Sequence, residues 1–137
     1  MNPPVTIDAS VFVSAFTPSE PAHQASKAFM LKVREQSVPI IVPVLVLPEI
    51  SAALSRGQGK PEPGLSFVQE LRNFPNTTFI DVNKNIADLA VEIAAHNRLR
   101  GSDAVYAAVA LRFGTELITL DREQLDRLPR VLPVREP

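Results

Sequence analysis

Apolar residues follow two patterns along this chain: short runs, and longer stretches in which they recur every three or four positions. The short runs, rich in Val, Ile and Leu, predict strands at residues 5–8, 39–43, 77–82, 116–120 and 130–134. The stretches of helical spacing predict helices over residues 9–16, 19–36, 44–57, 65–74, 83–100, 102–114 and 121–128. Because strands and helices alternate throughout, we predict an α/β domain in three layers, α/β/α, with a mainly parallel central sheet.

Residues that favour helix ends stand at several of these boundaries. They are the expected N-caps Ser19 and Ser102 and the expected C-terminal stops Gly57 and Gly114. Pro48 lies near the start of one predicted helix, so that helix either begins near Leu47 or kinks at the proline. Residues 57–64, rich in Gly and Pro, predict the longest loop.

The composition narrows the class of protein. The length of 137 residues fits one domain over residues 1–137, and 45% hydrophobic with 21% charged residues is typical of a folded globular chain. The absence of cysteine excludes disulfides, zinc–thiolate sites and cysteine nucleophiles. No signal-peptide pattern or membrane-length apolar run is found, so we expect a cytoplasmic protein with no membrane partner.

The net charge of −1 is not that of a typical nucleic-acid binder, which often carries a basic excess. A cluster of acids would, however, offset the charge of a locally basic surface, so the net charge does not exclude such a surface. Arginines are placed unevenly, with two close together before residue 101 and others crowding the C-terminus. The arginines that could contact phosphates are Arg56, Arg98, Arg100 and Arg122, with solvated surface as the alternative.

Two aspartates directly follow predicted strands. Asp8 ends the strand "VTI" and Asp121 ends the strand "LITL", so both belong at the carboxyl edge of a parallel sheet, where ligands bind. Asp103 stands at the start of the helix that leads into the second of these strands, where the helix dipole favours negative charge. Glu49 lies in an apolar helix, so its side chain either faces a narrow solvent stripe or points into a polar site.

If these four acids meet, either some of them are protonated or a cation is bound. At about 4 Å, two like charges repel by roughly 4 kcal/mol at an effective dielectric constant near 20. Oxygen ligands without cysteine or paired histidines select a hard ion, Mg²⁺ or Mn²⁺. Carboxylates that hold such an ion leave positions for water and a phosphate, which is the equipment for phosphodiester hydrolysis.

The stretches "VTIDASVFV", "VPVLVLPEISAALSRG", "LRGSDAVYAAVALRFGTELITLD" and "DREQL" resemble the PIN-domain nucleases, in particular the VapC-like toxins of toxin–antitoxin operons. With the spacing between them, the resemblance covers nearly the whole chain. It implies a PIN-like fold and a Mg²⁺- or Mn²⁺-dependent endoribonuclease acting on RNA. It also implies a homodimer and a cognate antitoxin partner that holds the toxin inactive.

The resemblance assigns roles residue by residue. Asp8, Glu49, Asp103 and Asp121 match the family's metal-binding and catalytic acids, while Ser10 and Thr119 match hydroxyls that hydrogen-bond near those acids. From the residues alone, Ser10 is also a helix N-cap and Thr119 a good strand former. Asp126 is either an accessory acid of the same pocket or a solvated surface residue.

Other functions remain open at this stage. One is a non-catalytic PIN-like scaffold that binds RNA or protein, and another is a stand-alone PIN nuclease without an antitoxin. Two further classes do not fit the residues. A receiver-like phosphoacceptor would need paired acids after the first strand and a lysine after a late strand, and "IDAS" and "TLDRE" supply neither. A haloacid-dehalogenase-type phosphatase would need Asp-x-Asp, where this chain has Ser10. The apolar faces near Phe12, Phe16, Phe29 and Leu31 exceed what one small core needs, and we expect a homodimer or antitoxin surface there.

Overall fold

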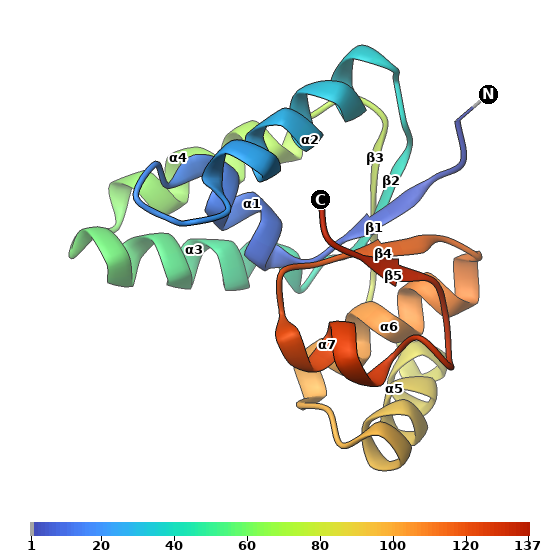
Figure 1. The fold of residues 1–137 in the computed structure, drawn as a ribbon. Helices are drawn as coiled ribbons and strands as arrows, with labels where there is room; N and C mark the ends of the chain where they lie inside the picture. Colours follow the sequence, from blue (N-terminus) through green and yellow to red (C-terminus); the bar gives the residue numbers. More distant parts are fainter. Residues whose placement is uncertain (1) are drawn as a thin grey trace.

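A parallel sheet forms the centre of the protein (Figure 1). The computed structural model describes residues 2–137. Its strands are β1 (Val5–Ile7), β2 (Ile40–Pro43), β3 (Thr77–Ile80), β4 (Glu116–Ile118) and β5 (Val134–Arg135). They lie in the order β3-β2-β1-β4-β5, and every neighbouring pair is parallel. The prediction of a mainly parallel sheet is therefore confirmed.

Helices form a layer on either side of the sheet (Figure 1). They are α1 (Ala9–Phe16), α2 (His23–Glu35), α3 (Val46–Gln58), α4 (Glu62–Arg72), α5 (Lys84–Asn97), α6 (Gly101–Phe113) and α7 (Arg122–Arg127). On one side α1 packs against α2 and α3, and α3 packs against α4. On the other side α6 lies against β1, β2 and β4, and α5 covers α6. The three-layer α/β/α architecture is thus as predicted.

Small side chains let α6 lie close to the sheet. The residues Ala104, Ala107, Ala108, Val109 and Ala110 are fully buried along it. Because β1 is also buried on both faces, the helix and the strand together form the middle of the core. The first turn of α6, which carries Asp103, is thereby brought to the centre of the molecule.

The strand order reverses beside β1. The chain runs outward from β1 to β2 and β3, and then returns across the sheet to place β4 on the other side of β1. Crossovers leave β1 and β4 in opposite directions, which opens a crevice at their carboxyl ends. Asp8 follows β1 at this point, and its backbone N–H donates to the carbonyl of Ile118, the last residue of β4.

Two predicted N-caps are wrong. Helix α2 begins at His23, after Ala22, and Ser19 lies in the preceding turn. The residue before Pro21 is disfavoured in helical conformation, which delays the helix. Helix α6 begins at Gly101, so Ser102 is already inside it, and the cap residue is Arg100.

The predicted loop over residues 57–64 is mostly helical. Helix α3 continues through Gly57 and stops at Gly59, whose φ of 71° is left-handed, and α4 begins at Glu62. Pro48 is the third residue of α3, which begins at Val46, so its missing N–H leaves no helical hydrogen bond unmade. The last strand is shorter and later than predicted, because Val131 and Leu132 lie in the turns after α7.

Candidate active site

A cleft of about 370 Å³ opens at the carboxyl ends of β1 and β4. Its walls include all four acids that the sequence singled out: Asp8, Glu49, Asp103 and Asp121. They come from four separate parts of the chain, which the fold brings together. The other charged residues of the lining are Glu20, from the turn between α1 and α2, Arg56, from the last turn of α3, and Arg100, which precedes α6.

Asp8 is one of the two most buried of these acids, with 6% of its surface exposed, as for Asp103. It is the N-cap of α1, and its Oδ2 accepts a hydrogen bond from the backbone N–H of Ser10 at 2.9 Å. Burial raises the pKa of Asp8, because the charged form loses its hydration. The negative charge of Asp8 is therefore held at a cost in the absence of a cation.

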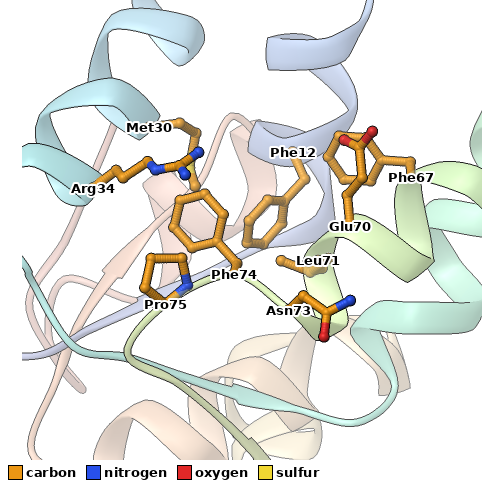
Figure 2. A pocket seen from close by; sticks show the side chains of 9 residues that line it. All are labelled: Phe12, Met30, Arg34, Phe67, Glu70, Leu71, Asn73, Phe74 and Pro75. Carbon is orange, nitrogen blue, oxygen red and sulfur yellow. The ribbon is translucent and has the colours of Figure 1, made fainter.

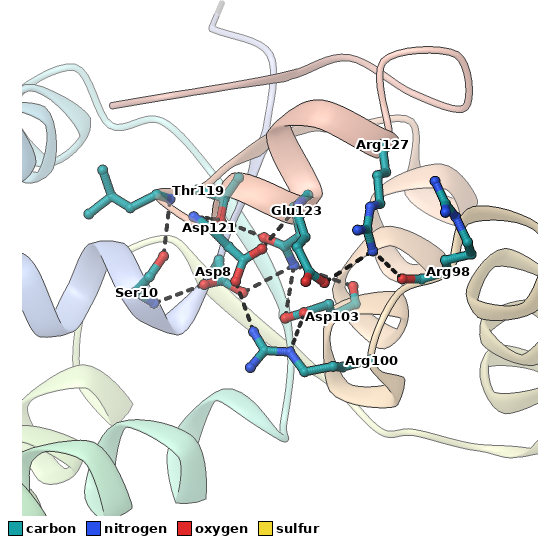
Figure 3. A network of polar contacts seen from close by, with 11 residues as sticks. Asp8, Ser10, Arg98, Arg100, Asp103, Thr119, Asp121, Glu123 and Arg127 are labelled. Atoms are coloured by element: carbon teal, nitrogen blue, oxygen red, sulfur yellow. Dashed lines mark hydrogen bonds and ion pairs between the residues drawn. The ribbon is translucent and has the colours of Figure 1, made fainter.

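The hydroxyls of Ser10 and Thr119 accept hydrogen bonds from backbone N–H groups beside the acids (Figure 3). The Ser10 Oγ accepts a hydrogen bond from the backbone N–H of Leu120 at 3.1 Å, which joins the start of α1 to the loop after β4. The Thr119 Oγ1 accepts from the backbone N–H of Asp121 at 3.0 Å. These contacts fix the backbone on which Asp8 and Asp121 stand.

Arg100 links two of the acids (Figure 3). Its Nε lies 2.9 Å from Asp103 Oδ2, and its second guanidinium nitrogen lies 2.8 Å from Asp121 Oδ2. The Arg100 side chain is 68% exposed, so it can move into solvent without breaking the core. Burial raises the pKa of Asp103, and the hydrogen bond from Arg100 partly opposes this.

Glu49 takes a different partner. It lies in the first turn of α3, and its Oε1 accepts a hydrogen bond from the Tyr106 hydroxyl at 2.6 Å. Burial and the nearby acids raise the pKa of Tyr106, so the phenol keeps its proton and acts as a donor. Of the two orientations open from the sequence, Glu49 therefore points toward the polar cleft and not to an isolated solvent stripe.

The four predicted phosphate-binding arginines have different surroundings. Only Arg56 and Arg100 line the cleft. Arg122 is exposed and lies near Asp126 and Glu136, at 3.9 and 3.3 Å. Asp126 thus stands on the solvated face of α7, the second of its two open interpretations. Arg98 ends α5 in a left-handed conformation, with its carbonyl accepting from Arg127 (Figure 3).

A second, apolar cavity of about 450 Å³ lies between α1, α2 and α4 (Figure 2). Phe12, Phe67 and Phe74 point into it, and Arg34 stands over the Phe74 ring at 5.9 Å. Phe12 is 1% exposed, so the expectation that it forms part of an exposed apolar face is wrong.

The other members of that expected face are only partly available. Phe16 is 38% exposed and packs edge-to-face with Phe67. Leu31 is 52% exposed, whereas Phe29 is half-buried beneath the guanidinium of Arg135.

Sequence reasoning did not find every residue of the site. Tyr106, Gln124 and Glu20 were not assigned a role there. Gln124 is completely buried, and its amide nitrogen lies 3.4 Å from both Asp8 Oδ1 and Asp103 Oδ1. A polar residue between Glu123 and Leu125 in a short helix gives no sign of burial, so only the packing of α7 reveals it.

Residues 5–131 match the sequence model of the PIN domain. The chain belongs to the PIN-domain family. The family expected from the sequence motifs is thus confirmed. This PIN domain is 23% identical over 128 residues to Ribonuclease VapC3 of Pyrobaculum aerophilum, spanning 93% of this chain and 97% of that protein.

Solved structures share the PIN fold at low sequence identity. VapBC2 from Rickettsia felis, bound to a DNA fragment from its promoter, matches with a TM-score of 0.74 and 15% identity over 98% of both chains. Mycobacterium tuberculosis VapC20, described as a sarcin–ricin loop cleaving toxin, matches with a TM-score of 0.72 and 18% identity, covering 94% of this chain and 99% of that one. Within residues 2–137, no helix is long and apolar enough to cross a bilayer.

PIN nucleases generally depend on divalent metals, and the donor set of this PIN domain fits such an ion. The cleft offers carboxylate oxygens without cysteine or histidine, which suits Mg²⁺ or Mn²⁺. The raised pKa values of Asp8 and Asp103 reflect charge that a cation would stabilise. Within residues 2–137, no group of three carboxylates is arranged to hold a metal ion in the present side-chain conformations. In this arrangement Arg100 is paired with Asp103 and Asp121.

Proposed function

We propose that this PIN domain is a Mg²⁺- or Mn²⁺-dependent endoribonuclease and the toxin of a toxin–antitoxin pair. The observation that carries the proposal is the meeting of four carboxylates from separate segments in one cleft at the point where the strand order reverses. The resemblance to VapC3 and VapC20, both named for RNA cleavage or ribonuclease activity, supports the choice of RNA. We further propose that residues 1–137 act as one PIN domain in the cytoplasm.

The residues of the cleft have distinct parts in this reaction. Asp8, Glu49, Asp103 and Asp121 would hold the cation, which when bound supplies an activated water and neutralises charge on the phosphate. Tyr106 keeps its proton and orients Glu49, while Ser10 and Thr119 fix the backbone beside the acids. Arg56, on the cleft wall, is placed to bind an RNA phosphate. Arg100, once released from the acids, can do the same.

Cleavage of a mixed panel of structured and single-stranded RNAs tests this function. The purified chain is assayed with Mg²⁺, Mn²⁺ or EDTA beside Asp8→Asn and Asp103→Asn, with Asp88→Asn as a control on the exposed face of α5. We expect metal-dependent cutting that both cleft variants lose and the control keeps. Cutting that persists in EDTA, or in both cleft variants, would reject the proposal.

The antitoxin partner is also a proposal for this chain. Several solved structures of similar fold are toxin–antitoxin complexes, such as the VapBC of Salmonella typhimurium bound to DNA. We assign the partner's contact to the apolar cavity between α1, α2 and α4 (Figure 2). The product of a small open reading frame beside this one should copurify with the chain and stop RNA cleavage.

A pair of variants on α4 locates that contact. Phe67→Lys, in the cavity wall, should prevent copurification, whereas Leu65→Lys, outside the cavity on the same helix, should not. Equal capture by both variants would place the partner elsewhere. The homodimer expected from the resemblance stays a prediction, which light scattering of the purified chain checks.

A further inference from the structure

Gln124 contacts three of the four acids, although sequence reasoning gave it no role. Its backbone N–H donates to Asp121 Oδ1 at 3.0 Å, because Asp121 caps α7. Its side-chain amide nitrogen lies 3.4 Å from Asp8 Oδ1, Asp103 Oδ1 and the Asp103 carbonyl oxygen. The side chain thus stands between the two most buried acids of the cleft.

The orientation of the Gln124 amide is set by hydrogen-bond direction. The Thr119 hydroxyl accepts from the backbone N–H of Asp121, and it lies 2.5 Å from Gln124 Oε1, which can only accept. Thr119 must therefore donate its hydrogen to that oxygen. This leaves the two hydrogens of the amide nitrogen facing Asp8 and Asp103. The Asp103 carbonyl oxygen, which can only accept, excludes the flipped amide, and the Thr119 hydroxyl holds the amide oxygen in place.

A purely structural role would not need an amide here. Gln124 is 0% exposed, and an apolar side chain of similar volume would fill the same space without the cost of desolvating a polar group. Leu128, four residues after Gln124, is equally buried and has an apolar side chain. The amide is instead matched by partners at both ends, and those at its nitrogen are the acids.

We propose that Gln124 is a positioning residue that holds Asp8 and Asp103 as a pair of metal ligands, and that Thr119 acts through it. As a neutral donor, the amide reduces the repulsion between the carboxylates without supplying a charge that would compete with a cation. The inference rests on the proposed function, because it concerns the same metal-binding acids. It predicts that loss of the amide loosens the site while leaving the fold intact.

Mn²⁺ binding by calorimetry, with melting temperatures in EDTA, tests the proposal. Gln124→Met keeps the volume and loses the donor, while Thr119→Val keeps Gln124 and loses the hydrogen that orients it. Each should weaken Mn²⁺ binding by about 10-fold or more, the usual effect of removing a partner of a metal ligand. Thr119→Ser, which keeps the hydroxyl, and Gln24→Met on the exposed surface of α2 should stay within about twofold of the wild type.

The outcomes separate this inference from the proposed function. Wild-type Mn²⁺ affinity in a folded Gln124→Met protein would overturn the role of Gln124 alone. If that variant does not fold, Thr119→Val decides, and equal loss in Thr119→Ser and Thr119→Val would overturn the role of the hydroxyl. Absence of Mn²⁺ binding by the wild type would overturn the proposed function, and this inference with it.

Discussion

Asp8 stabilises the folded protein in one way and destabilises it in another. Its side chain caps α1 by accepting from the Ser10 N–H, which stabilises the helix start. Its burial disfavours the charged form and raises its pKa above the ordinary 3.8. Since the folded protein binds this proton more tightly than the unfolded chain, the stability of the metal-free protein falls as pH rises from about 3.8 through the higher folded value.

Asp8→Asn should therefore stabilise the metal-free protein. Asparagine keeps the cap, because its carbonyl oxygen also accepts from the Ser10 N–H, and it has no charge to bury. In EDTA at pH 7 we expect a higher melting temperature than the wild type, with the difference shrinking toward pH 4. Added Mn²⁺ should raise the melting temperature of the wild type and not of the variant. A variant that melts below the wild type at pH 7 would show that the buried charge of Asp8 does not destabilise the metal-free protein.

Arg100 is paired with Asp103 and Asp121, so it would compete with the proposed cation for these two acids. Arg100→Gln removes the two ion pairs from the metal-free state, so Mn²⁺ no longer has to displace them. Because the guanidinium is exposed and screened by solvent, we expect Mn²⁺ affinity to rise only by roughly 2- to 10-fold. Calorimetry checks this, with the exposed Arg112→Gln at the far end of α6 as the control. Weaker Mn²⁺ binding in Arg100→Gln would mean that the arginine supports the ion site.

At the scale of elements, the contact between α3 and α4 depends on one glycine. A Cβ on Gly64 would lie 2.7 Å from the Ser51 carbonyl oxygen and 2.8 Å from Ser55 Oγ, so the two helices can approach this closely only without a side chain there. Gly57, by contrast, lies in the last turns of α3 with nothing near its Cβ position.

These two glycines make a matched pair of substitutions. Gly64→Ala should lower the free energy of unfolding by about 1–3 kcal/mol, because the helices must move apart. Gly57→Ala should raise it by about 0.5–1 kcal/mol through helix propensity. Urea denaturation of both variants in EDTA measures the changes. Similar stabilities for the two would contradict the close packing of α3 and α4.

Site residues could be predicted from the sequence where their placement follows from the strand or helix beside them. Asp8 and Asp121 follow buried strands, and in a parallel sheet that alone brings them to one edge. Helix ends were less predictable, because Pro21 and Gly59 outweigh the capping preference of Ser19 and the stop signal of Gly57.

Side-chain partners across the fold could not be predicted in the same way. Neither the pairing of Arg100 with two acids nor the burial of Gln124 follows from local spacing, since each depends on how α6 and α7 pack.

At the scale of the whole molecule, a net charge of −1 conceals an uneven surface. Five acids line one cleft, the four singled out from the sequence and Glu20, and Arg56 and Arg100 stand on its wall. Within residues 2–137, Arg56 forms no ion pair, whereas Arg122 and Arg135 are paired with acids on the surface. Within that range Arg56 is therefore an unpaired arginine beside the carboxylates, and we expect it to contact a phosphate of the proposed RNA substrate.

Arg56→Gln should consequently weaken RNA binding without changing Mn²⁺ affinity. Loss of one phosphate contact should reduce the slope of log K against log salt concentration by about 0.7 for single-stranded RNA. Binding is measured in an Asp8→Asn background, so that the RNA is not cut, with Arg122→Gln as the paired-arginine control. An unchanged slope in Arg56→Gln would remove Arg56 from the RNA path.

The central claim is that the four acids form one centre for a divalent cation. The most direct test is an anomalous difference map from crystals of the full chain grown with Mn²⁺. We expect a peak bounded by the carboxylates of Asp8, Glu49, Asp103 and Asp121, with the guanidinium of Arg100 turned away from Asp103 and Asp121. A peak elsewhere, or an Arg100 that keeps both ion pairs at saturating Mn²⁺, would contradict it.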